Sequence, residues 1–172
     1  MSCTSYTLKG LARDCSQSMG GIKTVYIANY ADVQNVTVGD EKITGVTMVD
    51  GAKFQTYNLR KGAGSFTSTA TIDNANGINY VTTDLVFNML KMDTTKRVEM
   101  TALSLNELAV IVEDANGVYW YLGKDEAVAS TTGTGATGTA RTDGNMYTIT
   151  LQDTSLTYPY EIEGAAVKAV IA

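Results

Sequence analysis

The chain has 172 residues, of which 44% are hydrophobic and 18% are charged, as is typical of one globular domain. It contains no histidine, which excludes Ser-His, Cys-His and His-metal chemistry. The formal net charge is −5, and residues 107–172 hold three Lys/Arg against nine Asp/Glu, whereas residues 1–106 hold ten against nine. We therefore predict neither an enzyme nor a protein that grips nucleic acid through basic residues.

Residues 1–21 are predicted to form an N-terminal arm, and residues 22–172 a single β domain. The arm is rich in Ser, Gly and short polar residues. It holds Cys3 and Cys15, whose spacing matches no zinc or redox motif and leaves their redox state open. There is no membrane-length apolar run and no apolar core of a signal peptide, so we expect a chain made in the cytosol without a membrane partner.

The first strands of the domain are predicted from β-branched and aromatic runs. Residues 22–30 form one strand, with Val25 and Ile27 on the same face. Residues 43–49 and 52–58 flank Asp50-Gly51, a pair that favours a type I′ turn, and this predicts a hairpin.

The clearest period-two alternation follows, in residues 65–72 and again in residues 81–89. Each segment has one apolar and one polar face, as in an antiparallel sheet with one wet side. The segment after it predicts the only helix, which begins after the N-cap Asp93 and ends near Leu105, with Val98, Ala102 and Leu105 on one face.

A further hairpin is predicted over residues 108–122, with Asn116-Gly117 in its turn. Its second arm carries three consecutive aromatic residues. Because successive strand residues alternate between faces, we expect Trp120 in the core, and Tyr119 and Tyr121 exposed or at an interface.

Residues 130–140 are mostly Thr, Gly and Ala, and are predicted to form a flexible loop. Strands over 146–151 and 160–171 complete the chain. The predicted fold is mainly β: an antiparallel β-sandwich or barrel with one α-helix.

No cofactor or metal site is predicted. Gly133, Gly135 and Gly138 match a dinucleotide-binding pattern, but no helix follows them to offer its N-terminus to a phosphate, so a loop is the better interpretation. The Asp/Asn/Gly groups at 73–77 and 114–117 lack the later carboxylate and flanking helices of a calcium loop and are interpreted as turns.

Two stretches carry a resemblance to a known family: residues 15–30, with Gly20-Gly21-Ile22-Lys23-Thr24-Val25-Tyr26, and residues 110–123, with Asp114-Ala115-Asn116-Gly117-Val118-Tyr119-Trp120. They resemble tail-tube and neck-ring subunits of tailed bacteriophages, including crAss-like and other phages of gut Bacteroidetes. The resemblance implies a β-sandwich or barrel whose subunits join edge to edge into a hexameric or dodecameric ring. It also implies a β-surface that lines a DNA channel, arms and loops that clasp adjacent tail or neck proteins, and no catalytic residues.

We therefore expect a structural virion protein of the tail or neck, assembled in the cytoplasm of the bacterial host, through which DNA passes without specific binding. We also expect the acidic C-terminal part to line the channel. The alternative is a β-sandwich binding module for capsid decoration, or for receptor or glycan binding. The candidate interface residues are Gly62, Gly64, Tyr119, Tyr121, Gly133, Gly135 and Gly138.

Overall fold

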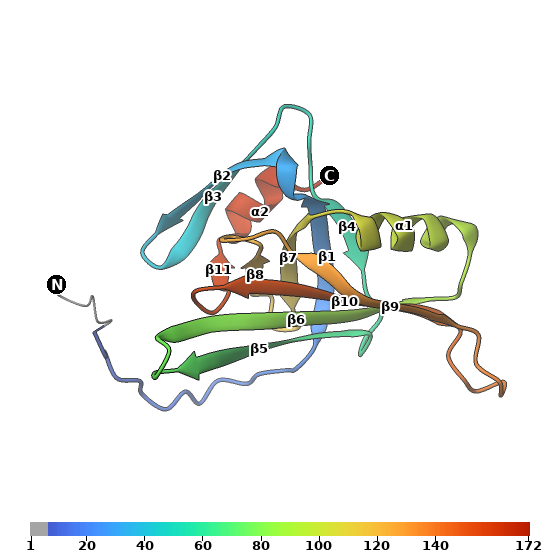
Figure 1. Cartoon of the computed structure of the whole chain (residues 1–172), viewed down its shortest axis with the longest axis horizontal. Helices are drawn as coiled ribbons and strands as arrows, with labels where there is room; N and C mark the ends of the chain where they lie inside the picture. The colour runs from blue at the N-terminus through green and yellow to red at the C-terminus, as the bar shows by residue number, and fades with distance from the viewer. Residues whose placement is uncertain (1–6) are drawn as a thin grey trace.

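A computed structural model describes residues 7–172 of the chain (Figure 1). Strands dominate this part of the protein. In chain order the elements are β1 (Ile22–Asn29), the 3-10 helix η1 (Tyr30–Asp32), β2 (Val33–Gly39), β3 (Lys42–Met48), β4 (Gln55–Asn58), β5 (Gly64–Asp73), β6 (Ile78–Leu90), α1 (Thr94–Leu105), β7 (Leu108–Asp114), β8 (Tyr119–Leu122), β9 (Ala129–Ala136), β10 (Met146–Ser155), β11 (Tyr160–Ile162) and α2 (Gly164–Val170).

The strands form two sheets. One has seven strands in the order β2-β3-β11-β8-β7-β1-β4, and the other has four in the order β5-β6-β10-β9. Neighbouring strands run antiparallel except β3 and β11, which are parallel. The predicted mainly β, antiparallel sandwich is confirmed.

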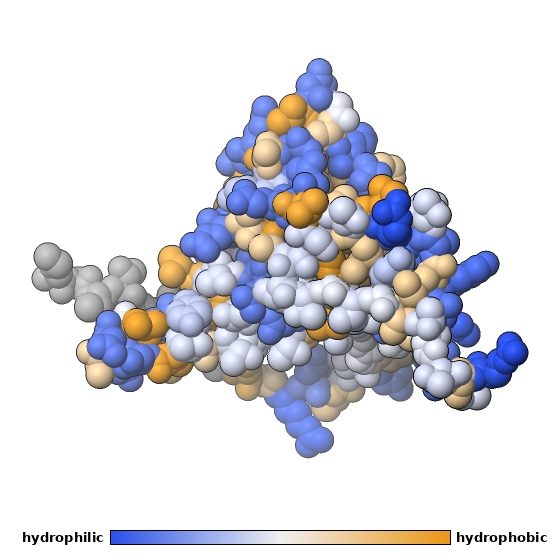
Figure 2. All heavy atoms as spheres, turned by 45° about the vertical axis from the view of Figure 1, so that its right-hand side comes forward, coloured by the Kyte–Doolittle hydropathy of each residue, from blue (hydrophilic) through white to orange (hydrophobic). Residues whose placement is uncertain are grey.

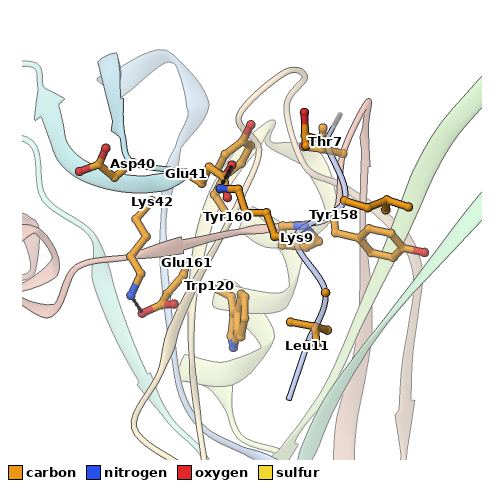
Figure 3. A pocket seen from close by; sticks show the side chains of 14 residues that line it. Thr7, Lys9, Leu11, Asp40, Glu41, Lys42, Trp120, Tyr158, Tyr160 and Glu161 are labelled. Carbon is orange, nitrogen blue, oxygen red and sulfur yellow. Dashed lines mark hydrogen bonds and ion pairs between the residues drawn. The ribbon is translucent and has the colours of Figure 1, made fainter. Parts of the chain in front are cut away.

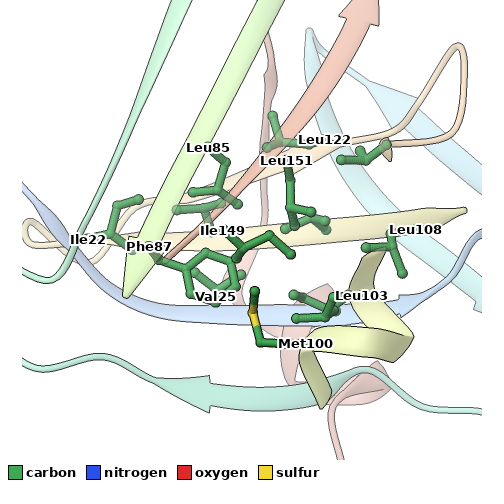
Figure 4. Packing of buried hydrophobic residues seen from close by; sticks show 14 residues of the cluster. Ile22, Val25, Leu85, Phe87, Met100, Leu103, Leu108, Leu122, Ile149 and Leu151 are labelled. Carbon is green, nitrogen blue, oxygen red and sulfur yellow. The ribbon is translucent and has the colours of Figure 1, made fainter. Parts of the chain in front are cut away.

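The main hydrophobic core lies between the two sheets (Figure 4). Leu85 of β6 and Leu151 of β10 face the seven-stranded sheet, from which Val25 of β1 and Leu108 of β7 contribute. Helix α1 adds Met100 at one end of this core. Val25, Leu85 and Leu151 are 0% exposed, Leu108 is 2% exposed and Met100 is 8% exposed, as expected for a close-packed interior.

A second core covers the opposite face of the seven-stranded sheet. Helix α2 packs Ala166, Val167 and Val170 onto it, alongside Ile43 and Ile111. The molecule therefore has three layers: the four-stranded sheet, the seven-stranded sheet and α2. The central strand β7 is buried on both faces, which explains why Leu108–Val112 is a continuous apolar run and not an alternating one.

Several predicted elements are confirmed. The strand at 22–29 pairs with β7, and the segments at 64–73 and 78–90 form the hairpin β5-β6. Helix α1 begins after Asp93, whose side chain accepts a hydrogen bond from the Lys96 backbone N–H at 2.9 Å. Its buried face was predicted wrongly, because Val98 and Leu105 are exposed and Met100 and Leu103 point into the core.

The hairpin predicted around Asp50-Gly51 is wrong. Gly51 does take a positive φ of 81°, but the chain then carries Phe54 into the second core, and β4 pairs with β1 instead of β3. The partner of β3 is β2, a strand that the sequence analysis missed. Asp40 and Glu41 turn the chain between them with φ values of 47° and 65°, so two acidic residues occupy a turn that usually holds Asn-Gly.

Two further predictions need correction. The expected final strand at 160–171 is β11 followed by α2, because apolar residues at 166, 167 and 170 have helical spacing and bury against the sheet. The flexible loop predicted at 130–140 is strand β9 as far as Ala136, because its backbone pairs with β10 along its length. The described residues therefore contain two α-helices, not one.

Candidate assembly surfaces

The four-stranded sheet has two long open edges. Within residues 7–172, β5 pairs only with β6, and β9 pairs only with β10. β5 has ten residues in an unbroken register, and β9 has eight with one register irregularity opposite Thr150 and Leu151. The edge strands of the larger sheet are the four-residue β4 and β2, whose register shifts twice. Short or bulged edges resist pairing with other chains, and long regular edges favour it.

The same sheet carries no Lys or Arg in any of its four strands. Its edges also lack the proline and inward-pointing charge that natural proteins use to block unwanted strand addition. Nothing in the side chains of β5 or β9 therefore opposes pairing with another copy of the chain.

The outward face of this sheet is rich in threonine. The inward positions of β6 and β10 are the buried ones, so the alternate positions form the face that is turned from the core. From the strand register the hydroxyl side chains on this face are Ser65, Thr67, Thr69, Thr71, Thr82, Thr132, Thr134, Thr148, Thr150 and Thr154. A pale band of near-neutral hydropathy crosses the face in Figure 2 at the level of this sheet.

Polar groups on the threonine-rich face pair with one another. The Gln152 side chain donates to Asp84 at 2.9 Å, and the Thr148 hydroxyl donates to Asn88 at 2.9 Å. Asp84 is the carboxylate at the centre of the face, and Asp73 lies at the end of β5. The face is therefore weakly negative and has little unpaired hydrogen-bonding capacity at its centre.

The acidic residues of the C-terminal part do not gather on this face. Glu113 and Asp153 are buried, at 7% and 2% exposure. Asp114 and Asp143 accept backbone hydrogen bonds in turns. The acidic residues of the C-terminal part are thus divided between buried positions and turns. The negative charge of the threonine-rich face comes from the N-terminal half, from Asp73 and Asp84.

The predicted interface glycines have local roles. A Cβ on Gly135 would lie 2.7 Å from the Tyr147 ring, and one on Gly133 would lie 3.3 Å from Met100 of α1. The absence of a side chain on these glycines therefore lets Tyr147 and α1 pack against β9. Both glycines are exposed on this edge strand, and their assignment to an interface stays a prediction. Gly138 turns the chain with a φ of 70° beside Asp143.

Gly62 precedes the edge strand β5, and Gly64 is its first residue. Gly62 has a φ of 76° and open space around its Cα, whereas a Cβ on Gly64 would lie 2.7 Å from the Leu59 side chain. Gly62 thus remains at the surface, close to the start of the edge strand.

Tyr121 is only 1% exposed and belongs to the second core, so its assignment to an exposed surface is wrong. The reason is that the seven-stranded sheet is covered on both faces, so the side opposite the main core is not free. Tyr119 is half-buried on that side, with its ring 6.4 Å from that of Tyr26. Trp120 packs against the main core as predicted, and its Nε1 donates to Asp114 at 3.2 Å.

A cleft of about 950 Å³ lies between the N-terminal arm and the segment that leads into β11 (Figure 3). Trp120, Tyr158 and Tyr160 line it together with Pro159. Sequence analysis missed this site because its aromatic residues come from two separate strands and a loop. The nearest signal was the aromatic run at 119–121.

The rim of the cleft is acidic. Asp40, Glu41 and Glu161 lie along it, and Glu161 pairs with Lys42 at 2.7 Å. Lys9 of the arm reaches Glu41 at 3.7 Å. The cleft thus combines an aromatic floor with a negative rim that the arm approaches through a positive side chain.

Neither helix in residues 7–172 is long and apolar enough to cross a membrane. The same residues contain no group of three or more His, Cys, Asp or Glu side chains that is suited to hold a metal ion. Cys15 is exposed and has a free thiol, and Cys3 lies outside the described residues.

No family model matches the chain, no curated protein is detectably similar to its sequence, and no solved structure is detectably similar to its fold.

Proposed function

We propose that this chain is a structural subunit of a phage tail tube or neck ring that joins copies of itself edge to edge around a DNA channel. The observation that carries the proposal is the four-stranded sheet, which has two long open edges, the β5 edge being regular throughout, and no basic residue in any strand. The edges supply the means of assembly, and the sparsely charged face supplies a surface that does not hold phosphates.

The strand directions support a closed ring. The order β5-β6-β10-β9 is antiparallel throughout, so β5 and β9 run in opposite directions. A second copy that is related by rotation therefore places its β9 antiparallel to the β5 of the first. The sheet continues through every interface without a change of hydrogen-bond pattern, and closure removes the last open edge.

The threonine-rich face is the side that would line the channel, because the main core covers the other side of the sheet. Six copies supply twenty-four strands, and a closed sheet of that size is roughly 45 Å wide between backbones at ordinary spacing and tilt. Side chains reduce the bore to roughly 35 Å, and twelve copies would double the backbone width. Six copies therefore match a DNA duplex more closely.

In this proposal DNA passes over hydroxyl groups and a few carboxylates without specific binding. Phosphate binding depends on Lys and Arg, and their absence from the face removes the sites at which a moving duplex would stall. The subunit works in the virion, at the tail or neck, and contacts neighbouring tail or neck proteins through surfaces outside the sheet.

The test is negative-stain microscopy with native mass measurement of the full chain. Rings or tubes with a fixed copy number are expected, and a stable monomer at high concentration would contradict the proposal. The paired variants Thr69→Pro and Ala70→Pro refine the test, because successive residues of an edge strand direct their N–H groups alternately to the neighbouring strand and to the open edge. The variant that removes an N–H bonded to β6 should be destabilised. The other variant removes only an N–H at the open edge, so it should be as stable as the natural protein but form no rings.

A second candidate function is a binding module that takes a glycan in the aromatic cleft. Trp120, Tyr158 and Tyr160 with a carboxylate rim favour it, because sugar rings stack on aromatic faces and bond to carboxylates. This function predicts saturable oligosaccharide binding by a protein that remains a monomer.

A further inference from the structure

We propose that the aromatic cleft receives the N-terminal arm of a second copy of the chain, with Leu8 and Leu11 as its anchors. The inference rests on the self-assembly proposed above and adds a second, separate contact between copies. Two observations on residues 7–172 carry it: Leu8 and Leu11 of the arm are exposed, and an open aromatic cleft lies beside them.

Among the described residues, the hydrogen bonds between the arm and the body of the protein lie at the root of the arm. The backbone N–H of Met19 donates to the Asn116 side chain at 2.8 Å, and the Asn116 amide donates back to the Met19 carbonyl at 3.0 Å. The Ala115 N–H donates to the Gly21 carbonyl at 3.0 Å. Between Thr7 and Gln17 the described contact with the body of the protein is the Lys9–Glu41 pair.

The leucines of the arm remain in solvent. Leu8 is 97% exposed and Leu11 is 102% exposed, although both belong to the segment that borders the cleft. Single exposed leucines are ordinary, but two of them three residues apart beside an aromatic cleft form an apolar pair that residues 7–172 leave uncovered. The arm therefore lies along its own cleft without burying its apolar side chains there.

The charges of arm and cleft are complementary. The arm carries Lys9 and Arg13 with one carboxylate, Asp14, and the rim carries Asp40 and Glu41 beside Glu161, which Lys42 already pairs. Opposite charges of this kind favour encounter and fix the register of the bound segment. The ten residue steps from Leu8 to the root at Ser18 span roughly 33 Å when extended, which is enough to reach an adjacent copy.

Disulfide trapping distinguishes exchange between copies from closure within one chain. In full chains with Cys3→Ser and Cys15→Ser, one protein carries Leu11→Cys and the other carries Tyr158→Cys. On oxidation of the mixture we expect a covalent dimer of twice the 18.4 kDa chain mass. Met19→Cys replaces Leu11→Cys in the control mixture, because Met19 is exposed but held at the root, and it should not link.

Two results would overturn the inference. One is an intrachain link in a double Leu11→Cys/Tyr158→Cys protein with no link between the single variants, since the arm would then close on its own cleft. The other is the absence of any link, since the arm would then not occupy the cleft at all.

The fluorescence of Trp120 gives an independent measurement, because it is the only tryptophan in the chain and lines the cleft. We expect its emission to shift to shorter wavelength as the natural protein assembles. In Leu8→Ser/Leu11→Ser the shift should need at least tenfold more protein, and folding should be unaffected because both side chains are exposed. A saturable change with cellohexaose, without arm cross-links, would identify a glycan site and contradict the inference.

Microscopy separates this inference from the proposed function. Rings without arm cross-links would leave the ring function in place and overturn the arm contact. Cross-linked chains that never form rings would support the arm contact and contradict the ring function.

Discussion

Asp153 lies on the inward side of β10, where its carboxyl group is 2% exposed and accepts the Gly123 N–H at 3.2 Å. Burial raises the pKa of this carboxyl group to about 6, and the nearby charges of Asp125 and Glu126 act in the same direction against the single hydrogen bond. The charged form is therefore poorly accommodated at neutral pH.

Asp153→Asn is expected to stabilise the protein above pH 6. Because the pKa is raised in the folded state, the contribution of Asp153 to stability is greatest below about pH 4 and is lost as the pH rises through about 6. The variant should gain roughly 1–2 kcal/mol at pH 7.5, after allowance for solvent screening, and the gain should shrink towards pH 4. Urea unfolding at several pH values measures this, and a gain independent of pH would show that ionisation is not its cause.

Tyrosine residues show how position decides the role of a side chain. Tyr26 donates to Glu113 at 3.3 Å, and burial together with that carboxylate raises the pKa of Tyr26 to about 12. Tyr121 is more deeply buried, and its hydroxyl group has no hydrogen-bond partner among residues 7–172. From the sequence the two are similar strand tyrosines.

Among the elements, β9 is the one in which composition and structure differ most. Its eight residues consist of Ala, Ser, Thr and Gly, a composition that is typical of a loop. It is ordered as a strand because β10 satisfies its backbone and because the absence of side chains on Gly133 and Gly135 lets α1 and Tyr147 approach.

Gly135→Val tests this account of β9. Its side chain would collide with Tyr147, whose ring atoms lie 2.7 Å and 2.9 Å from the position of a Cβ. Moving the ring is expected to cost about 1–3 kcal/mol. Thr134→Val is the matched control, because Thr134 faces outward on the same strand and valine has nearly the same shape. Thermal unfolding of both variants measures the difference, and equal stability would contradict the inward packing of Gly135.

Helix α1 shows what a sequence pattern can and cannot predict about a helix. The ends of α1 follow from the N-cap Asp93, whose pKa is lowered by its hydrogen bonds with Lys96. Its buried face does not follow, since Val98 and Met100 are both apolar and only the position of the sheets selects Met100.

For the whole molecule, the proposed channel requires a threonine-rich face that does not bind DNA, and the proposed reason is its lack of positive charge. Thr82→Lys with Thr150→Lys places two cations at the centre of that face, since both threonines are on its outward side. We expect these variants to gain DNA binding that weakens steeply with salt, because added lysines contact phosphates.

The control places the same charge elsewhere. Ala165→Lys with Ala169→Lys adds two lysines to the exposed side of α2, in the layer remote from the four-stranded sheet. Fluorescence anisotropy with a short duplex, over a series of salt concentrations, compares the two proteins. Equal binding by both would show that net charge and not the face governs the interaction.

The sequence by itself determined the β class, the hairpins β5-β6 and β7-β8, and the limits of α1. These features depend on residues close together in the chain: alternation over ten residues, an Asp/Asn-Gly turn and an N-cap. The sequence also shows that these four strands contain no Lys or Arg. Only the structure shows that the four strands form one sheet, and so one surface without basic residues.

Tertiary structure alone decided how the strands combine. β4 pairs with β1 and β9 with β10 because long-range packing of Phe54 and the close approach of α1 outweigh local turn signals and composition. The open edges, the threonine-rich face and the aromatic cleft follow from those pairings, since each collects residues that are distant in the chain. A local pattern fixes the direction of a side chain within a strand, but only the neighbouring layers decide whether that direction leads to core or to solvent.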